Sequence, residues 1–255
     1  MKSIIIPILS LCISLAVAIV ITQIWTLKRR KNNTLTKKRK IGIFFVWWAV
    51  CFVVGAIGYF GSYYRADKEE YTYLESTDTV NVTSEKDYWF FDGKGDESAL
   101  IFYQGAKVDE KAYADIMMSL ADEGVDCFLV KMPLNMAFTG KNRAASIITS
   151  HDYDSWYIAG HSLGGAMAGV FAASHGDMLD GIIFLASYST APLSDDLKVV
   201  SITASNDKVL DWDAYYANEH NLPDDYTDVV ILGGNHSQFG NYGRQKKDGT
   251  ASISA

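Results

Sequence analysis

The stretch Tyr157-Ile158-Ala159-Gly160-His161-Ser162-Leu163-Gly164-Gly165 decides the fold. Apolar residues before it predict a buried strand, and small apolar residues after it predict a packed helix. Between them lies the spacing G-x-S-x-G, with Ser162 at its centre. A strand that turns sharply into a helix brings two backbones close together, and Gly160 and Gly164 leave room for that approach. We therefore expect Ser162 to be held out at the edge of a sheet, beside a helix N-terminus whose N–H groups face an anion.

Strands and helices alternate on both sides of this stretch. Apolar runs predict strands at residues 80–83, 88–91, 99–103, 125–130, 156–159, 181–186, 199–203 and 228–232. Helical patterns cover residues 109–123, 141–150, 164–173 and 211–220. Strands that are apolar throughout and alternate with helices indicate a mostly parallel sheet with helices on both faces. The loop after 181–186 is short, so we expect no large lid.

Two polar residues after Ser162 follow predicted strands, where the base and the orienting acid for a serine hydroxyl are expected. Asp207 directly follows the strand 199–203 and its short loop, and His236 follows the last strand. Because the carboxyl ends of parallel strands meet at one edge of the sheet, these side chains are expected near Ser162. A serine needs a base to become a nucleophile, and the base needs an orienting acid. The order Ser, Asp, His predicts such a constellation.

Other acids and histidines are weighed against these two. Asp211 or Asp213 could replace Asp207, which could also merely begin a turn or cap the next helix. Three of the remaining histidines stand in solvated positions: His151, His175 and His220. His161, inside the G-x-S-x-G spacing, is expected to pack behind the site rather than act as the base.

An oxyanion also needs N–H donors. One is expected from Leu163, the residue after Ser162. The second is expected in Gln104-Gly105-Ala106, which follows the strand 99–103. We favour the N–H of Ala106, with Gly105 or Lys107 as alternatives one residue away.

The charge of the chain is divided between two parts of opposite sign. Of its 23 basic residues, ten lie in residues 1–66, which contain no Asp or Glu. Residues 67–255 contain the other 13 basic residues and all 30 acidic residues, so their net charge is 13 − 30 = −17. Phosphate binding needs clustered Lys and Arg, so nucleic acid is excluded as a partner of this acidic part. The three cysteines and the five histidines show no zinc-ligand spacing, and no metal or organic cofactor is expected.

Two apolar runs, Ile4–Leu27 and Ile41–Phe60, are each long enough to cross a bilayer as a helix. A cleaved signal peptide is the alternative for the first, because Ala16-Val17-Ala18 has a small-x-small pattern. Between the runs, residues 28–40 carry eight cations, which the positive-inside rule places in the cytoplasm. Residues 1–60 are thus expected to anchor the protein in a cell membrane, with everything after Phe60 on the outer face.

After the anchor, residues 61–79 are expected to form a linker and residues 80–255 one α/β domain. The chain ends soon after Gly249, where a further closing helix would be expected. Neither the oligomeric state nor the pathway follows from the sequence.

The Gly160–Gly165 turn, the Asp207 loop and the Gly234-Asn235-His236 loop together resemble the α/β-hydrolase superfamily. Within it, Tyr103–Asp109 and His236–Gly243 are similar to compact bacterial serine hydrolases related to dienelactone hydrolases. The resemblance covers about residues 80–249. Dienelactone hydrolases have a cysteine at the position of Ser162 in this turn. The serine therefore departs from that family and favours ester hydrolysis over hydrolysis of its particular lactone.

This resemblance implies hydrolysis of esters or related acyl compounds. Together with the expected membrane anchor, it predicts a membrane-anchored serine hydrolase that cleaves small carboxylic esters through an acyl-enzyme. Ser162 would be the nucleophile, His236 the base and Asp207 its orienting acid. A peptidase or acyltransferase could use the same residues, and a non-catalytic binding module on the same scaffold is a further alternative.

Overall fold

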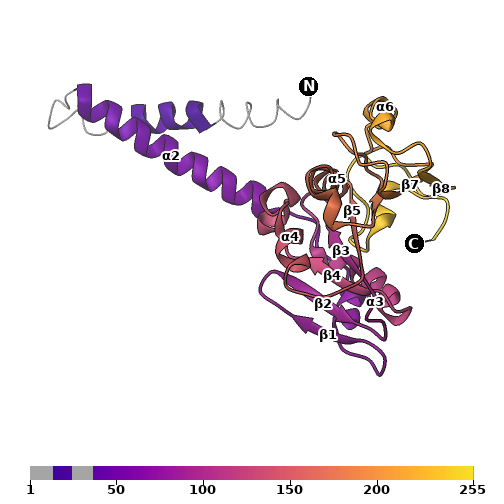
Figure 1. The fold of residues 1–255 in the computed structure, drawn as a ribbon. Helices are drawn as coiled ribbons and strands as arrows, with labels where there is room; N and C mark the ends of the chain where they lie inside the picture. Colours follow the sequence, from indigo (N-terminus) through magenta and orange to yellow (C-terminus); the bar gives the residue numbers. More distant parts are fainter. Residues whose placement is uncertain (1–13, 25–36, 255) are drawn as a thin grey trace. The chain divides into compact units, whose positions relative to one another are not determined.

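The computed structural model describes residues 14–24 and 37–254. The chain divides into two units, residues 1–62 and 63–255, and each is considered by itself (Figure 1). In the first unit, α2 (Lys37–Gly61) contains a segment, Lys38–Gly61, that is long and apolar enough to cross a membrane. Residues Ser14–Ile24 form a shorter apolar helix.

The two apolar runs predicted to form membrane helices therefore have different outcomes. The second run, Ile41–Phe60, lies within α2, and α2 is the one helix of spanning length among the described residues. Of the first run, 4–27, only residues 14–24 are described, and the apolar helix they form is shorter than a membrane span. Residues 28–36 of the basic segment lie outside the described residues. Lys37 to Lys40, assigned above to a loop, form the first turn of α2, because the apolar run behind them propagates the helix towards its N-terminus.

The second unit is built on one eight-stranded sheet with the strand order β1-β2-β4-β3-β5-β6-β7-β8. The strands are β1 (Asn81–Ser84), β2 (Tyr88–Asp92), β3 (Ser98–Tyr103), β4 (Asp126–Val130), β5 (Ser155–His161), β6 (Gly181–Leu185), β7 (Lys198–Ala204) and β8 (Thr227–Ile231). β2 runs antiparallel to β1 and β4, and all other neighbours are parallel. The predicted mostly parallel sheet is confirmed, and residues 186–197 between β6 and β7 contain no helix.

The helices of this unit are α3 (Ala114–Asp122), α4 (Arg143–Ile148), α5 (Leu163–His175) and α6 (Trp212–Ala217). Short 3-10 helices are η1 (Lys68–Leu74), η2 (Glu110–Tyr113), η3 (Pro133–Asn135), η4 (Ala137–Thr139), η5 (Gly176–Met178), η6 (Glu219–Asn221) and η7 (His236–Phe239). The expected helix 211–220 ends early as α6. Asn218 leaves the helical conformation, with φ −104° and ψ 2°, and its side-chain amide donates to the carbonyl of Ala214 in the last turn at 2.8 Å.

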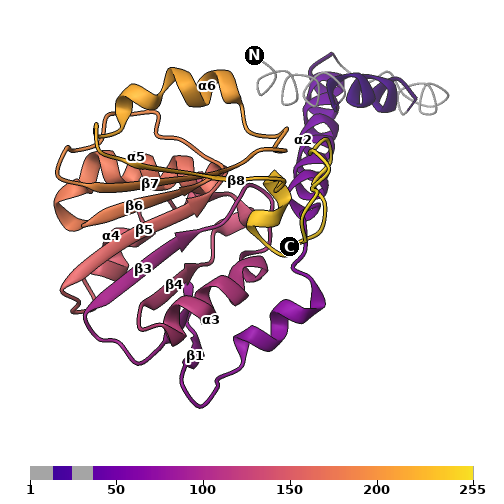
Figure 2. The same cartoon turned by 90° about the vertical axis from the view of Figure 1, so that its right-hand side faces the viewer.

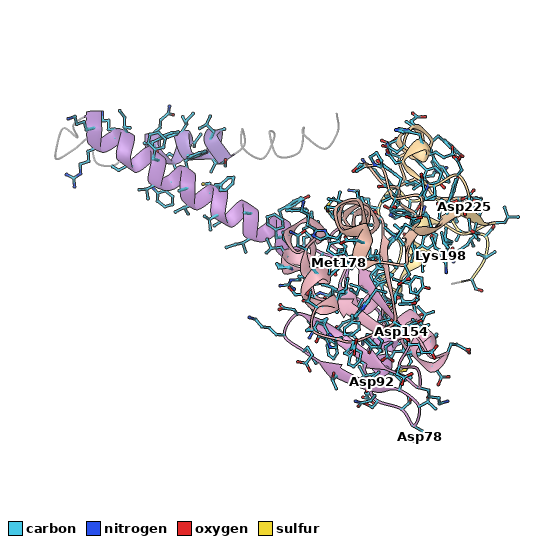
Figure 3. All side chains as sticks on the ribbon, in the orientation of Figure 1. Asp78, Asp92, Asp154, Met178, Lys198 and Asp225 are labelled. Carbon is cyan, nitrogen blue, oxygen red and sulfur yellow. The ribbon has the colours of Figure 1, made fainter. Side chains whose placement is uncertain are left out.

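The sheet separates two apolar cores, because side chains alternate along each strand. On β3, Leu100 and Phe102 join the core beneath α3. Ile101 on the same strand faces the other core, which α4 and α5 cover. Figure 2 shows the helices on both sides of the sheet. Acidic residues such as Asp78, Asp154 and Asp225 are exposed in loops at the surface of this unit (Figure 3).

Most of the segment expected as a linker packs on the α/β domain. The N–H of Tyr64 donates to the carbonyl of Lys107 at 2.7 Å, and Asp67 N–H donates to Asn241 at 2.9 Å. Glu70 is 1% exposed and accepts a hydrogen bond from the Asn241 amide at 2.7 Å. Burial raises the pKa of Glu70 despite that hydrogen bond, and the nearby Asp115 carboxylate raises it further. The 61–79 segment is therefore in contact with the domain from Tyr64 onward.

Candidate active site

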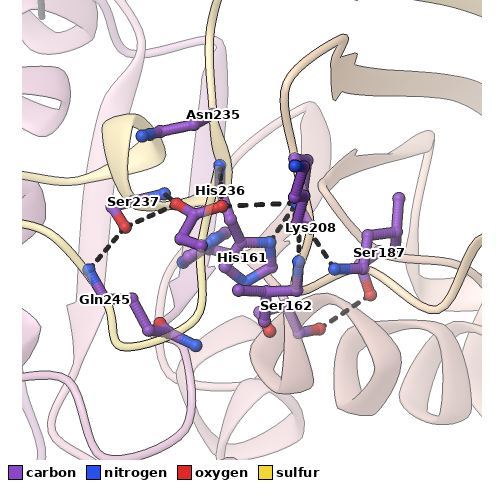
Figure 4. Close-up of polar contacts among 12 residues, drawn as sticks. His161, Ser162, Ser187, Lys208, Asn235, His236, Ser237 and Gln245 are labelled. Atoms are coloured by element: carbon purple, nitrogen blue, oxygen red, sulfur yellow. Dashed lines mark hydrogen bonds and ion pairs between the residues drawn. The ribbon is translucent and has the colours of Figure 1, made fainter. Parts of the chain in front are cut away.

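Ser162 stands at the turn between β5 and α5 in a backbone conformation that non-glycine residues rarely adopt, with φ 54° and ψ −123°. Its N–H donates to the carbonyl of Leu185 at 2.9 Å. Its own carbonyl accepts the hydroxyl of Ser187 at 2.7 Å (Figure 4). Strain of this kind persists only where neighbouring structure imposes it, and it is common at functional sites. The end of β6 thus holds Ser162 in the expected sharp turn.

The two glycines of the turn are required by close backbone approach. A Cβ on Gly160 would lie 2.5 Å from the carbonyl carbon of Gly164. A Cβ on Gly164 would lie 2.1 Å from the carbonyl oxygen of Tyr103, at the end of β3. Neither contact is possible for a real side chain, so both positions accept only glycine without a backbone shift.

Asp207 and His236 meet at the carboxyl ends of β7 and β8. Oδ2 of Asp207 lies 2.7 Å from Nδ1 of His236, and the two side chains are 0% and 1% exposed. Oδ1 of the same carboxylate accepts the N–H groups of Val209 at 2.7 Å and Leu210 at 2.8 Å. Both carboxylate oxygens are therefore satisfied, and Nδ1 of His236 carries the proton that the carboxylate accepts.

Nε2 of His236 is buried and has no hydrogen-bond partner among the described residues. In particular, no hydrogen bond joins it to Ser162 Oγ. The ring of His161, which directly precedes Ser162, lies 4.5 Å from the ring of His236, so Ser162 and His236 belong to the same cluster (Figure 4). Hydrogen bonds between a nucleophile and its base are often long or misaligned before a substrate is bound.

His161 connects the cluster to the loop after β3. It is fully buried, as expected for a packed residue, and its Nδ1 lies 2.8 Å from the hydroxyl of Tyr113. That hydroxyl accepts the N–H of Gly105 at 3.1 Å. Burial lowers the pKa of His161 well below its usual value, and a proton gained by the neighbouring His236 lowers it further. His161 is therefore neutral, and its Nδ1 accepts the Tyr113 proton.

The N–H groups of the loop after β3 are used unequally. Gly105 donates to Tyr113, and Lys107, with φ 58°, donates to the carbonyl of Asn135 at 2.7 Å. Ala106 between them has no hydrogen-bond acceptor for its N–H among the described residues. Leu163 is the first residue of α5, whose N–H has no intrahelical partner. Of the three donors considered after β3, Ala106 alone has an N–H left for a ligand.

The rival acids and histidines have other contacts. Asp211 accepts the N–H of Ala214 at 3.1 Å and caps α6, while Asp213 is exposed. The Nδ1 atoms of the rival histidines face nearby backbone carbonyls: His151 that of Ile147, His175 that of Phe171 and His220 that of Ala217. None of these histidines is paired with a carboxylate.

Two residues that support the site had not been anticipated. Tyr113 lies in what reads as an ordinary amphipathic helix. Asp248 lies in Lys247-Asp248-Gly249, which reads as an exposed turn. Its carboxylate is nevertheless 3% exposed and accepts hydrogen bonds from both loops that carry Asp207 and His236. No local pattern marks either residue, because their partners are distant in the chain.

The described residues contain no group of three His, Cys, Asp or Glu that could hold a metal ion. Ser162, Leu163 and Ala106 are each partly exposed, so solvent and a small molecule can reach them. The described residues thus offer a partly exposed serine, a buried histidine–carboxylate pair and two N–H groups, those of Leu163 and Ala106, that have no acceptor among them.

Comparison with solved structures identifies similar folds. A predicted CIB-like hydrolase from Thermoplasma acidophilum is 13% identical, with a TM-score of 0.50 over 64% of this chain and 92% of that chain. A Thermus thermophilus protein is 11% identical, with a TM-score of 0.50 over 62% and 91%. Est1E from Butyrivibrio proteoclasticus is 13% identical, with a TM-score of 0.49 over 66% and 92%. At such identities the first two likenesses concern the fold alone.

Comparison with curated proteins gives no match. The likeness to dienelactone hydrolases in particular remains a prediction. The sequence profile of the alpha/beta hydrolase family, in contrast, matches residues 99–255, which include Ser162, Asp207 and His236. This chain therefore belongs to the alpha/beta hydrolase family.

Proposed function

We propose that this protein is a serine hydrolase that cleaves small carboxylic esters through an acyl-enzyme intermediate. The observation that carries the proposal is the buried pair of Asp207 and His236, 2.7 Å apart, in the same cluster as a serine with strained backbone. A buried carboxylate on Nδ1 leaves Nε2 as the acceptor, which is what a general base for a serine hydroxyl requires.

Ser162 Oγ attacks the ester carbonyl carbon, and Nε2 of His236 takes the hydroxyl proton. The Asp207 carboxylate stabilises the imidazolium that forms. The carbonyl oxygen becomes an oxyanion and accepts hydrogen bonds from the N–H groups of Leu163 and Ala106. As the tetrahedral intermediate collapses, His236 gives its proton to the leaving alcohol. A water molecule, activated by the same histidine, then hydrolyses the acyl-enzyme and restores Ser162.

The direct test is Ser162→Ala in the full chain. The wild type is expected to hydrolyse p-nitrophenyl acetate and to be labelled by a fluorophosphonate probe, and the variant is expected to do neither. Ser174→Ala is the matched control, because Ser174 is exposed near the C-terminal end of α5, where its hydroxyl donates to the carbonyl of Val170. Turnover or labelling retained by Ser162→Ala would contradict the proposal. A panel of matched esters, amides and lactones then determines which acyl compounds are preferred.

We also propose that α2 anchors the protein in a cell membrane with residues 63–255 on the outer face. Its length and lack of charge after Lys40 support a membrane span, and the basic residues before it support a cytoplasmic start. Ser62→Cys is expected to react with an impermeant maleimide on intact cells, and Asn33→Cys only after permeabilisation. The reverse labelling pattern would overturn the orientation.

A further inference from the structure

Asp248 is a buried carboxylate that the chemistry above does not use. It is 3% exposed and lies 12 residues after His236 and 40 residues after Lys208 in the chain. Its Oδ2 accepts the N–H of Ser237 at 2.8 Å and the hydroxyl of Ser237 at 2.7 Å. Its Oδ1 accepts the N–H of Gly249 at 2.7 Å. A buried carboxylate satisfied in this way is costly to move, because every donor would lose its partner.

The remaining contacts of Asp248 reach the two loops that hold the histidine–carboxylate pair. Oδ1 accepts the N–H of Lys208, the residue after Asp207, at 3.4 Å. It also accepts the N–H of His236 itself at 3.4 Å. One oxygen atom therefore bridges the backbones of the loops after β7 and β8. These loops carry Asp207 and His236, whose side chains must stay within hydrogen-bond distance of each other.

The chain around Asp248 reinforces this bridge. The Asn206 amide donates to the carbonyl of Thr250 at 3.1 Å, and the Asn235 amide donates to the carbonyl of Gly249 at 2.9 Å. A Cβ on Gly249 would lie 1.7 Å from the carbonyl oxygen of Asn206, so the segment touches the Asp207 loop directly. The contacts thus lie on the residues immediately before Asp207 and His236 as well as after them.

Asp248 is ionised in this position. Burial works to raise its pKa, but the Ser237 hydroxyl and the surrounding backbone N–H groups outweigh burial and lower the pKa below its usual value. A carboxylate accepts hydrogen bonds on both oxygens, and here both oxygens are used, whereas a carboxamide has only one accepting oxygen. The bridge therefore depends on the acid as such and not only on its volume.

From this geometry we infer that Asp248 is a positioning residue for the histidine–carboxylate pair. Its carboxylate fixes the β7 and β8 loops relative to each other, and so keeps Nδ1 of His236 on Oδ2 of Asp207. It touches neither substrate nor Ser162, and it acts only through these loops. The inference rests on the proposed function for its kinetic consequence, but its structural consequence can be measured independently.

The test compares Asp248→Asn with the wild type in the full chain, in detergent micelles. In Asp248→Asn the kcat for p-nitrophenyl acetate is expected to fall at least tenfold, with KM changed less than threefold. Labelled with 15N-histidine, the wild type is expected to show His236 ring nitrogens of a single tautomer with the proton on Nδ1. The variant is expected to show averaged nitrogen shifts, because the pair is no longer held. His236→Gln assigns the signals.

Ser237→Ala is the second variant, because it keeps the Asp248 carboxylate and removes one of its five hydrogen bonds. It is expected to lower kcat less than Asp248→Asn does, and it decides the matter if Asp248→Asn does not fold. A folded Asp248→Asn with wild-type kcat and an unchanged His236 spectrum would overturn the inference, as would wild-type behaviour of Ser237→Ala when only that variant folds. If Ser162→Ala keeps full activity, the proposed function fails instead, and the His236 spectrum still decides the role of Asp248.

Discussion

Replacing Asp207 by asparagine changes one atom of the site and leaves its surroundings in place. The Oδ1 position still accepts the N–H groups of Val209 and Leu210, so the loop after β7 keeps its shape. The Oδ2 position becomes an NH₂ group that faces Nδ1 of His236 at 2.7 Å. An NH₂ group donates, so Nδ1 must accept, and the imidazole proton moves to Nε2. A histidine with the proton on Nε2 cannot take the proton of Ser162.

The size of the expected fall in kcat follows from the burial of Asp207 and His236. With side chains 0% and 1% exposed, no water can replace the lost interaction or restore the tautomer. In serine enzymes with this arrangement the same change lowers kcat about 10⁴-fold. At about 1.36 kcal/mol per tenfold change, this corresponds to about 5.4 kcal/mol of the activation barrier. The loss exceeds the roughly 1.5–3 kcal/mol of a single charge-assisted hydrogen bond, because the tautomer is wrong as well.

The assay is the initial rate of p-nitrophenyl acetate hydrolysis, with circular dichroism to show that the variant is folded. Asp211→Asn is the matched control, since Asp211 caps α6 through Oδ1 and asparagine caps a helix about as well as aspartate. We expect kcat to fall by three to four orders of magnitude in Asp207→Asn, a range taken from related sites, and to stay unchanged in Asp211→Asn. A folded Asp207→Asn with a tenth or more of the wild-type activity would refute the assigned role of Asp207.

Three further outcomes follow from the structure. Tyr113→Phe removes the acceptor of the Gly105 N–H, and kcat is expected to fall about tenfold, equivalent to one hydrogen bond of about 1–1.5 kcal/mol; an unchanged kcat would show that this loop needs no such support. Gly164→Ala places a Cβ 2.1 Å from a backbone oxygen and should lower the free energy of unfolding, measured in urea, by about 1–3 kcal/mol. Gly176→Ala is the control, because its nearest contact lies at 3.9 Å and no loss is expected. Equal stabilities of the two variants would contradict the packing described. The pKa of Asp248 is lower in the folded than in the unfolded chain, so its stabilisation is complete above the unfolded pKa and is lost as the pH falls through the folded one. Urea unfolding should show a smaller acid-induced loss of stability in Asp248→Asn than in the wild type, and equal losses would exclude this linkage.

Much of the fold could be predicted because its signals are local. The strands expected at 99–103 and 199–203 lie within β3 and β7, and the turn at Ser162 follows from glycine spacing that a strand-to-helix reversal requires. Apolar runs that alternate with helical patterns indicate which segments are buried strands. The order of serine, aspartate and histidine along the chain can also be read directly from the sequence.

Other features depend on contacts between residues far apart in the chain, which no local pattern records. The segment 61–79 has the polar composition of a linker, yet Glu70 is buried against Asn241, 171 residues away. Asp248 has the sequence of a surface turn, and only the path of the chain brings its carboxylate to Lys208 and His236. The amino-acid sequence by itself determined which residues could perform the chemistry and on which elements they stand. The tertiary structure decided which of them meet, because hydrogen bonds between separate loops depend on the relative positions of the strands that carry them.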